Sequence, residues 1–127
     1  MLQYHTKRHP ASTETTIRFI RAHGLGNDYL VLETNDKLTP HLVVSICNRH
    51  TGIGSDGILE PFHDERADYG VRIHNPDGTV AEKSGNGLRI FAQWIADTKK
   101  VYDFTLSTGF CVVSAQVRAD GVTVEMG

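Results

Sequence analysis

Three glycine-rich polar loops hold the residues of this sequence that could do chemistry: HGLGND at residues 23–28, TGIGSDG at residues 51–57 and NPDGTVAEKSGNG at residues 75–87. Glycine allows positive φ, so the backbone there can approach a ligand closely. The third loop runs into an apolar helical segment, so the N–H groups of Gly85, Asn86 and Gly87 are predicted to point outward without partners. Such a helix start binds a carboxylate or phosphate. The alternative for each loop is a simple turn, which glycine and asparagine also favour.

The histidines near these loops, His23, His50 and His74, lack the spacing of a metal site. None belongs to an H-E-x-x-H or paired-cysteine motif, and Cys47 with His50 makes only a single C-x-x-H, so we expect no metal. HGLGND differs from the dinucleotide fingerprint G-x-G-x-x-G in its spacing, and a strand pattern follows it where the fingerprint needs a helix. We therefore expect no nicotinamide cofactor.

Three acidic residues of the loops, Asp28, Asp56 and Asp77, each stand within a glycine-containing turn pattern. Aspartate in such a position commonly accepts a hydrogen bond from the backbone one or two residues further on. We therefore predict that these carboxylates stabilise their own turns.

The composition excludes several classes of protein. The 127 residues suit one domain, and 39% hydrophobic with 22% charged residues is enough to form a core. Thirteen basic and fifteen acidic side chains are interspersed for a net charge of -2, so we expect a small-molecule partner and neither nucleic acid nor membrane. Two cysteines, Cys47 and Cys111, are too few for a disulfide framework, and we expect them in a helix and a strand. With no apolar h-region near the N-terminus, the sequence favours a cytoplasmic location.

The elements that must position these loops follow from hydrophobic periodicity. Residues 1–16 are polar without a period and are predicted to be a mostly disordered leader, with a smaller chance of an edge strand. Helices are predicted at residues 39–50 and 87–99, the second apolar over much of its circumference. Short strands are predicted at residues 17–20, 29–32, 58–60, 69–74, 103–107, 111–117 and 122–126, with turns at residues 75–78 and 120–121. Residues 17–127 are thus expected to form one α+β domain, a curved mixed or antiparallel sheet, barrel-like, wrapped around a central helix.

Three long motifs in order, HGLGNDYLVLE, NRHTGIGSDGIL and RIHNPDGTVAEKSGNGLRIFA, resemble the diaminopimelate epimerase family over residues 18–127. The resemblance implies a cofactor-independent isomerase that interconverts LL- and meso-diaminopimelate, in lysine and cell-wall precursor synthesis, by removing and returning the α-proton. It also implies two similar domains that close over the substrate, each with a catalytic cysteine at the start of its central helix. This sequence would be the N-terminal domain.

The resemblance also assigns roles to residues of this sequence. Asn27 and Asn75 would hydrogen-bond the polar ends of the substrate, and the amides of Gly85 and Asn86 would hold its α-carboxylate. Ser84 occupies the position of the catalytic cysteine. The helix dipole would favour the carboxylate and stabilise the negative charge that builds on it as the α-proton leaves.

Serine at this position leaves three functions open. A thiol near a helix N-terminus is readily ionised, whereas an alcohol is a far weaker acid, although Ser84 can still donate or relay a proton. Neither Cys47 nor Cys111 falls at the catalytic position. The chain is therefore a serine variant of the epimerase, a non-catalytic amino-acid-binding module, or another cofactor-independent racemase of related substrates.

The sequence stops at VTVEMG, where by resemblance the family passes into its second domain. The opposite catalytic residue would then come from a second domain or from a two-fold homodimer in which one Ser84 faces the other. The homodimer hypothesis predicts a dimer in sedimentation velocity at micromolar concentration, and a monomer there would remove it.

Overall fold

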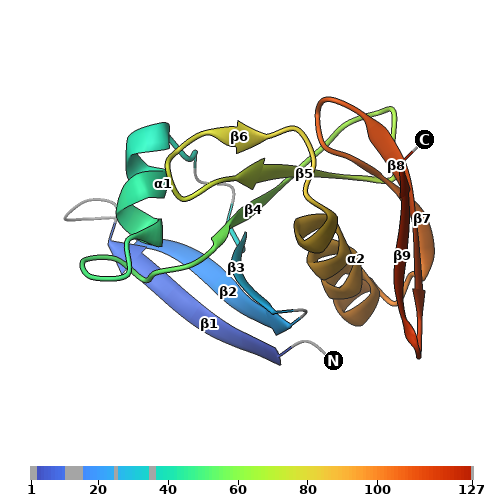
Figure 1. Cartoon of the computed structure of the whole chain (residues 1–127), viewed down its shortest axis with the longest axis horizontal. Coiled ribbons are helices and arrows are strands. Elements are labelled where there is room, and N and C mark those ends of the chain that lie inside the picture. The colour runs from blue at the N-terminus through green and yellow to red at the C-terminus, as the bar shows by residue number, and fades with distance from the viewer. Residues whose placement is uncertain (1–2, 11–15, 25, 35–36, 127) are drawn as a thin grey trace.

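The computed structural model describes residues 3–10, 16–24, 26–34 and 37–126, which form an α+β domain (Figure 1). Within these residues there are two helices and one sheet of nine strands. In chain order the elements are β1 (Gln3–Pro10), β2 (Thr16–Gly24), β3 (Asn27–Leu32), α1 (Pro40–Cys47), β4 (Gly57–Phe62), β5 (Tyr69–His74), β6 (Val80–Ala81), α2 (Gly85–Lys99), β7 (Asp103–Ser107), β8 (Val112–Arg118) and β9 (Gly121–Met126).

The sheet is mixed and open. Its strand order is β1-β2-β3-β4-β5-β7-β8-β9, with β6 paired beside β5. The β3–β4 and β5–β7 pairs are parallel, and the other pairs are antiparallel. The sheet curves so that β1–β3 and β7–β9 lie on opposite sides of α2 (Figure 1). The α+β class and the mixed sheet are confirmed, but the barrel-like closure is wrong, because β1 and β9 remain unpaired edges.

Helix α2 forms the centre of the larger core. It contacts strands β2, β3, β5, β8 and β9. Its side chains Leu88, Phe91 and Ile95 are fully buried or nearly so, at the helical spacing that predicted this face. The opposite face of the sheet carries a second core, in which Val43 and Ile46 of α1 are packed with residues of β2, β3 and β4. Strands β3 and β4 are therefore covered on both faces where they carry the short apolar runs Tyr29–Leu32 and Ile58–Leu59.

Local chemistry sets the ends of α1. Thr39 caps its start by accepting a hydrogen bond from the Leu42 N–H at 3.2 Å, as predicted from Thr39 and Pro40. The helix ends at Cys47, three residues before the predicted end at His50. The Asn48 Oδ1 accepts the N–H groups of residues 50 and 51 and turns the chain out of the helix. Neither α1 nor α2 is long and apolar enough to cross a membrane.

The predicted leader contains a strand. Residues 3–10 form β1, which pairs with β2 along its full length. For these residues the less favoured prediction, an edge strand, is confirmed, and the prediction of disorder is wrong. The Tyr4 hydroxyl of β1 donates a hydrogen bond to Asp97 of α2 at 2.6 Å. Residues 1–2 and 11–15 of the predicted leader lie outside the described residues.

The two hairpin turns near the C-terminal end differ slightly from prediction. Between β8 and β9 the pairing of Arg118 with Gly121 leaves Ala119 and Asp120 as the turn, one residue earlier than predicted. Cys111 lies in the turn before β8, whereas a strand position was expected. Cys47 is helical as predicted.

Candidate active site at the start of helix α2

Ser84 is the residue before the first turn of α2 and caps that helix. Its backbone is extended, with φ -144° and ψ 118°, and its Oγ accepts the Gly87 N–H at 3.2 Å. The helix therefore starts at Gly85, two residues earlier than predicted, and the Gly87 N–H is paired where the sequence predicted it to be free.

The Gly85 and Asn86 N–H groups lie in the first turn of α2, where the sequence predicts an anion site. No residue in the described part of the chain accepts a hydrogen bond from either group, and the first turn holds no acidic residue. The Arg89 guanidinium adds a positive charge beside them, because a Cβ on Gly85 would lie 3.0 Å from Arg89 Nη1. Among the described residues this guanidinium has no hydrogen-bond or ion-pair partner. The start of α2 is thus positive and ready for a carboxylate.

Tyr29 is a residue of the site that the sequence analysis missed. It lies on β3 with 8% of its surface exposed, and its hydroxyl is 3.4 Å from Ser84 Oγ. Gly57 on the paired strand β4 makes room for its ring, since a Cβ there would lie 2.9 Å from Tyr29 Cε1. Alternation of side chains along β3 could have revealed Tyr29, because it places Tyr29 and Val31 on the same side of the strand, which faces α2.

The two predicted substrate asparagines stand at strand ends. Asn27 opens β3 and, by strand alternation, lies on the same face as Tyr29. Asn75 follows β5, and its side-chain amide donates to Thr79 Oγ1 at 3.0 Å inside the predicted turn. That turn is packed on α1, because a Cβ on Gly78 would lie 3.0 Å from the Pro40 carbonyl oxygen. The structure therefore brings Ser84, Gly85 and Asn86 together, while the Asn75 amide group is engaged within its own turn.

Asp28 and Asp56 connect the first two glycine-rich loops to each other. The Asp28 N–H donates to the Asp56 carboxylate at 2.8 Å, and the Asp56 N–H donates to the Asp28 carbonyl at 2.8 Å. Arg21 pairs with the Asp28 carboxylate and also donates to the Gly54 carbonyl at 2.8 Å. The prediction of purely local turn bonds is wrong for Asp28 and Asp56, because parallel pairing of β3 with β4 places the two loops side by side. It is confirmed for Asp77, which accepts from the Thr79 N–H.

His74 is a buried structural histidine. Its Nε2 lies 2.9 Å from Glu60 Oε1, which also accepts a hydrogen bond from Arg72 Nη1 at 3.2 Å. Burial by itself would raise the pKa of Glu60, but the hydrogen bond and charge of His74, and then those of Arg72, hold that pKa below its ordinary value. These residues lie on the face of the sheet away from α2. No group of three potential metal ligands occurs in the described part of the chain.

Neither cysteine stands at the start of α2. Cys47 is buried, and its Sγ accepts a hydrogen bond from Ser55 Oγ at 3.3 Å. Burial raises the pKa of Cys47, which makes its thiol a poor nucleophile. Cys111 lies 3.6 Å from Thr108 Oγ1 in the β7–β8 turn. The residue at the start of α2 is thus Ser84, and both thiols lie elsewhere in the fold.

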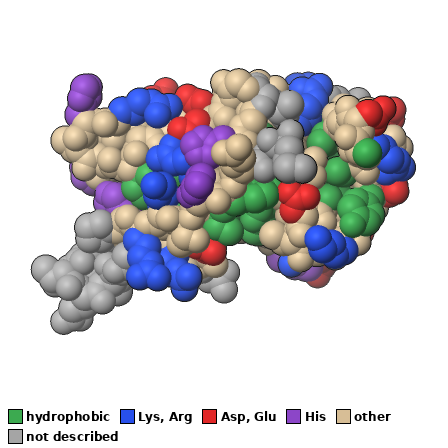
Figure 2. All heavy atoms as spheres, turned by 90° about the horizontal axis from the view of Figure 1, so that it is seen from below, with side chains coloured by type: hydrophobic (Ala, Val, Ile, Leu, Met, Phe, Trp, Pro, Cys, Tyr) green, Lys and Arg blue, Asp and Glu red, His purple; other side chains and the backbone are tan. Residues whose placement is uncertain are grey.

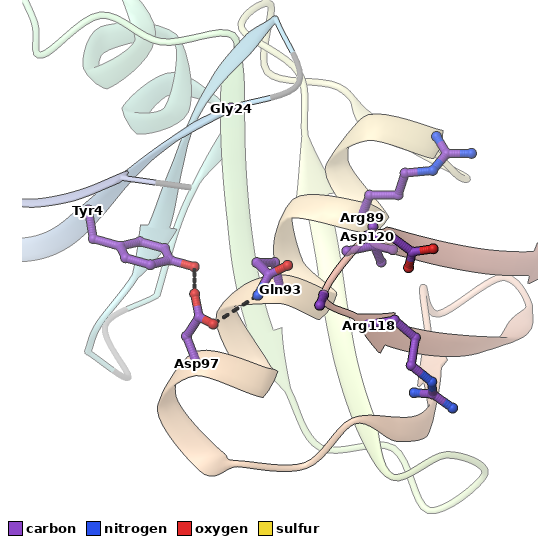
Figure 3. Close-up of a pocket in the computed structure, with 10 residues that line it drawn as sticks. Tyr4, Gly24, Arg89, Gln93, Asp97, Arg118 and Asp120 are labelled. Carbon is purple, nitrogen blue, oxygen red and sulfur yellow. Dashed lines mark hydrogen bonds between the residues drawn. The ribbon is translucent and has the colours of Figure 1, made fainter. Parts of the chain in front are cut away.

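A cavity of about 670 Å³ lies along α2 between the two open sheet edges (Figure 3). Tyr4 of β1 points across it to Asp97, which also accepts from Gln93 at 2.8 Å, while Arg118 and Asp120 border it on the other side. Burial, together with the hydrogen bond and charge of Asp97, raises the pKa of Tyr4. None of the five predicted site residues lines this cavity. The surface seen in Figure 2 mixes acidic, basic and hydrophobic side chains, in keeping with the interspersed charge of the sequence.

The fold and the site together define an α+β domain that offers a capped helix start to a carboxylate, and comparison with known proteins gives the family. The model of the family "Diaminopimelate epimerase" matches residues 19–127. The chain belongs to the diaminopimelate epimerase family.

Curated relatives show the extent of the similarity. Diaminopimelate epimerase 2 of Nostoc sp. is 44% identical over 116 residues, which is 87% of this chain and 41% of the relative. Diaminopimelate epimerase of Rhodospirillum centenum is 41% identical, over 87% of this chain and 40% of the relative. The chloroplastic diaminopimelate epimerase of Oryza sativa subsp. japonica is 35% identical, over 91% of this chain and 35% of the relative. The chain thus spans about two fifths of the length of these isomerases.

The Asp28 pairing predicts a stability cost when its charge is removed. Asp28→Asn leaves Arg21, whose side chain is only 11% exposed, without its ion-pair partner. The free energy of unfolding should fall by about 2 kcal/mol in urea titrations followed by Trp94 fluorescence. Asp77→Asn is the matched control at an exposed turn and should cost less. Equal losses in the two variants would contradict a special role for the contact between the loops.

The low pKa of Glu60 predicts a pH dependence of stability. Because the pKa of Glu60 is lower in the folded chain than its ordinary value of 4.5, its stabilisation is complete above that value and is lost as pH falls through the folded pKa. Glu60→Gln should lower the free energy of unfolding at neutral pH by about 1–2 kcal/mol and flatten its decline below pH 4.5. The exposed Glu65→Gln variant is the control. If the free energy of unfolding of Glu60→Gln declined below pH 4.5 as steeply as that of the parent, the stabilising role of Glu60 would be contradicted.

Proposed function

We propose that this domain binds the α-carboxylate of diaminopimelate at the start of α2 and places Ser84 at the acid/base position of a cofactor-independent epimerase. The observation that carries the proposal is the pair of free N–H groups at Gly85 and Asn86, directly after the Ser84 cap, in a chain of this family. The reaction would interconvert the LL and meso forms of the substrate, a step of lysine and cell-wall precursor synthesis.

The carboxylate site would assist the chemistry as well as binding. When the α-proton leaves, negative charge spreads from the α-carbon onto the carboxylate, where the two N–H groups and the helix dipole stabilise it. The Arg89 guanidinium beside Gly85 strengthens this field. Asn27 and Asn75 would bind the polar ends of the substrate, the latter after exchanging its hydrogen bond with Thr79. A second domain or a second copy of the chain would supply the group on the opposite face.

A second candidate function is a non-catalytic amino-acid-binding module, and the observation that favours it is serine at position 84. It would keep the carboxylate site without a strong base. A related racemase of another amino acid would use the same site, because the start of α2 recognises a carboxylate and leaves the side chain of the substrate unspecified.

The proposal predicts exchange of the α-hydrogen in D₂O. A base on one face is enough for exchange, so the chain by itself should catalyse incorporation of deuterium into LL- or meso-diaminopimelate, measured by NMR. Ser84→Ala should abolish the exchange, and Ser84→Cys should raise it about 100-fold because a thiolate is a usable base. Ser114→Ala, on the exposed side of β8, is the matched control and should behave like the parent.

Binding is measured separately through the amide signals of Gly85 and Asn86 during titration with meso-diaminopimelate. Shifts of these signals without exchange in the parent or in Ser84→Cys would support the binding module and contradict the epimerase. Absence of both shifts and exchange would contradict both functions, and the same exchange measured on a panel of amino acids would reveal a different racemase.

A further inference from the structure

The Ser84 hydroxyl has two neighbours that restrict what it can do. One of its lone pairs accepts the Gly87 N–H at 3.2 Å. The Tyr29 hydroxyl lies 3.4 Å away on the sheet side. If the tyrosine donates to Ser84 Oγ, the serine hydrogen is left to point away from both partners, toward the open helix start. Ser84 would then be an oriented proton donor, and the Tyr29 hydroxyl could in turn donate a proton to Ser84 Oγ.

We propose that Tyr29 acts through Ser84 as the proton reservoir of a two-hydroxyl relay, which takes the place of a single ionised thiol. This inference rests on the proposed function, since it concerns the proton transfer at that same site. Aliphatic alcohols are much weaker acids than phenols, so the charge in such a pair settles on the phenol oxygen. The serine only passes the proton on and never has to exist as a free alkoxide.

The proton balance of the relay is complete within these two residues and the substrate. When the substrate carbanion is protonated, the Cα–H bond forms as the Ser84 O–H bond breaks. A new Ser84 O–H bond forms as the Tyr29 O–H bond breaks, and the negative charge moves from the α-carbon to the Tyr29 oxygen. Removal of the α-proton is the reverse, starting from the deprotonated tyrosine. Between removal and return of the α-hydrogen, the Tyr29 hydroxyl exchanges its hydrogen with D₂O, so deuterium reaches the substrate.

The position of Tyr29 is fixed independently of any ligand. Its strand β3 pairs in parallel with β4, and Gly57 on β4 leaves the space that the ring occupies. The titratable residues next to Ser84 in the sequence, Glu82 and Lys83, are exposed, and neither has a hydrogen bond to Ser84 in the described part of the chain. Tyr29 is thus the titratable side chain that the fold brings to Ser84 Oγ.

A double-mutant cycle on α-hydrogen exchange separates this role from a structural one. Tyr29→Phe should lower the rate of deuterium incorporation into meso-diaminopimelate about 100-fold in the Ser84 parent. In the Ser84→Cys variant the thiolate is its own base, so adding Tyr29→Phe should change the rate less than about 3-fold. A tyrosine that only supports the fold would reduce both backgrounds by the same factor. Tyr69→Phe is the matched control, because Tyr69 is packed on Phe104 in the same core.

Each outcome decides the relay, and the set of outcomes separates failure of the relay from failure of the proposed function. If Tyr29→Phe lowered the exchange rate by the same factor in the parent and in Ser84→Cys, or left the parent rate unchanged, the relay would be overturned and the epimerase would stand. Exchange by Ser84→Cys but none by the parent would overturn the relay and the acid/base role of Ser84, while the carboxylate site stands. Absence of exchange in every variant, with the Gly85 and Asn86 amides still shifting on binding, would overturn the relay and the epimerase together and leave the binding module.

Discussion

Burial of α2 inside the curved sheet is the constraint on which the rest of this structure depends. The helix contacts five strands, and its fully buried side chains each contribute about 1.5–3 kcal/mol by leaving water. A helix held on several sides cannot slide or rotate without opening the core. Its first turn is therefore fixed relative to β3, which is why Ser84, Gly85 and Asn86 meet the Tyr29 hydroxyl at a defined place.

The glycine-rich loops take their geometry from the same sheet. Parallel pairing of β3 with β4 sets the first loop beside the second. Two hydrogen bonds join them, from the Asp28 N–H to the Asp56 carboxylate and from the Asp56 N–H to the Asp28 carbonyl. Arg21 completes the junction from β2. Glycine at position 57 matters for a reason other than turning the chain, because it leaves room for the ring of Tyr29. The junction of the two loops thus stands next to Tyr29, the aromatic residue whose hydroxyl approaches the helix start.

Much of this arrangement could be predicted from the sequence, and the exceptions share one cause. The spacing of Leu88, Phe91 and Ile95 predicted the buried helix, and the end of the third glycine-rich loop predicted its start to within two residues, because both signals are local. The contact of Tyr29 with Ser84 spans 55 residues and depends on which strand borders α2. Three other features were also missed: the hydrogen bond from the Gly87 N–H to Ser84, the strand β1 and the open sheet edges. They depend on neighbours in three dimensions, which hydrophobic periodicity does not encode.

Ser84 caps helix α2 and stands at the position proposed for acid/base chemistry. Serine is among the preferred residues for capping a helix start, where its oxygen satisfies a backbone N–H that would otherwise be unpaired. Cysteine is not among those residues, so the same position favours serine for folding and cysteine for reactivity. In this chain serine strengthens the helix at the centre of the core, and its hydroxyl is a much weaker acid than the thiol of cysteine. Under the proposed function, helix stability and proton-transfer reactivity would therefore place opposite demands on this one side chain.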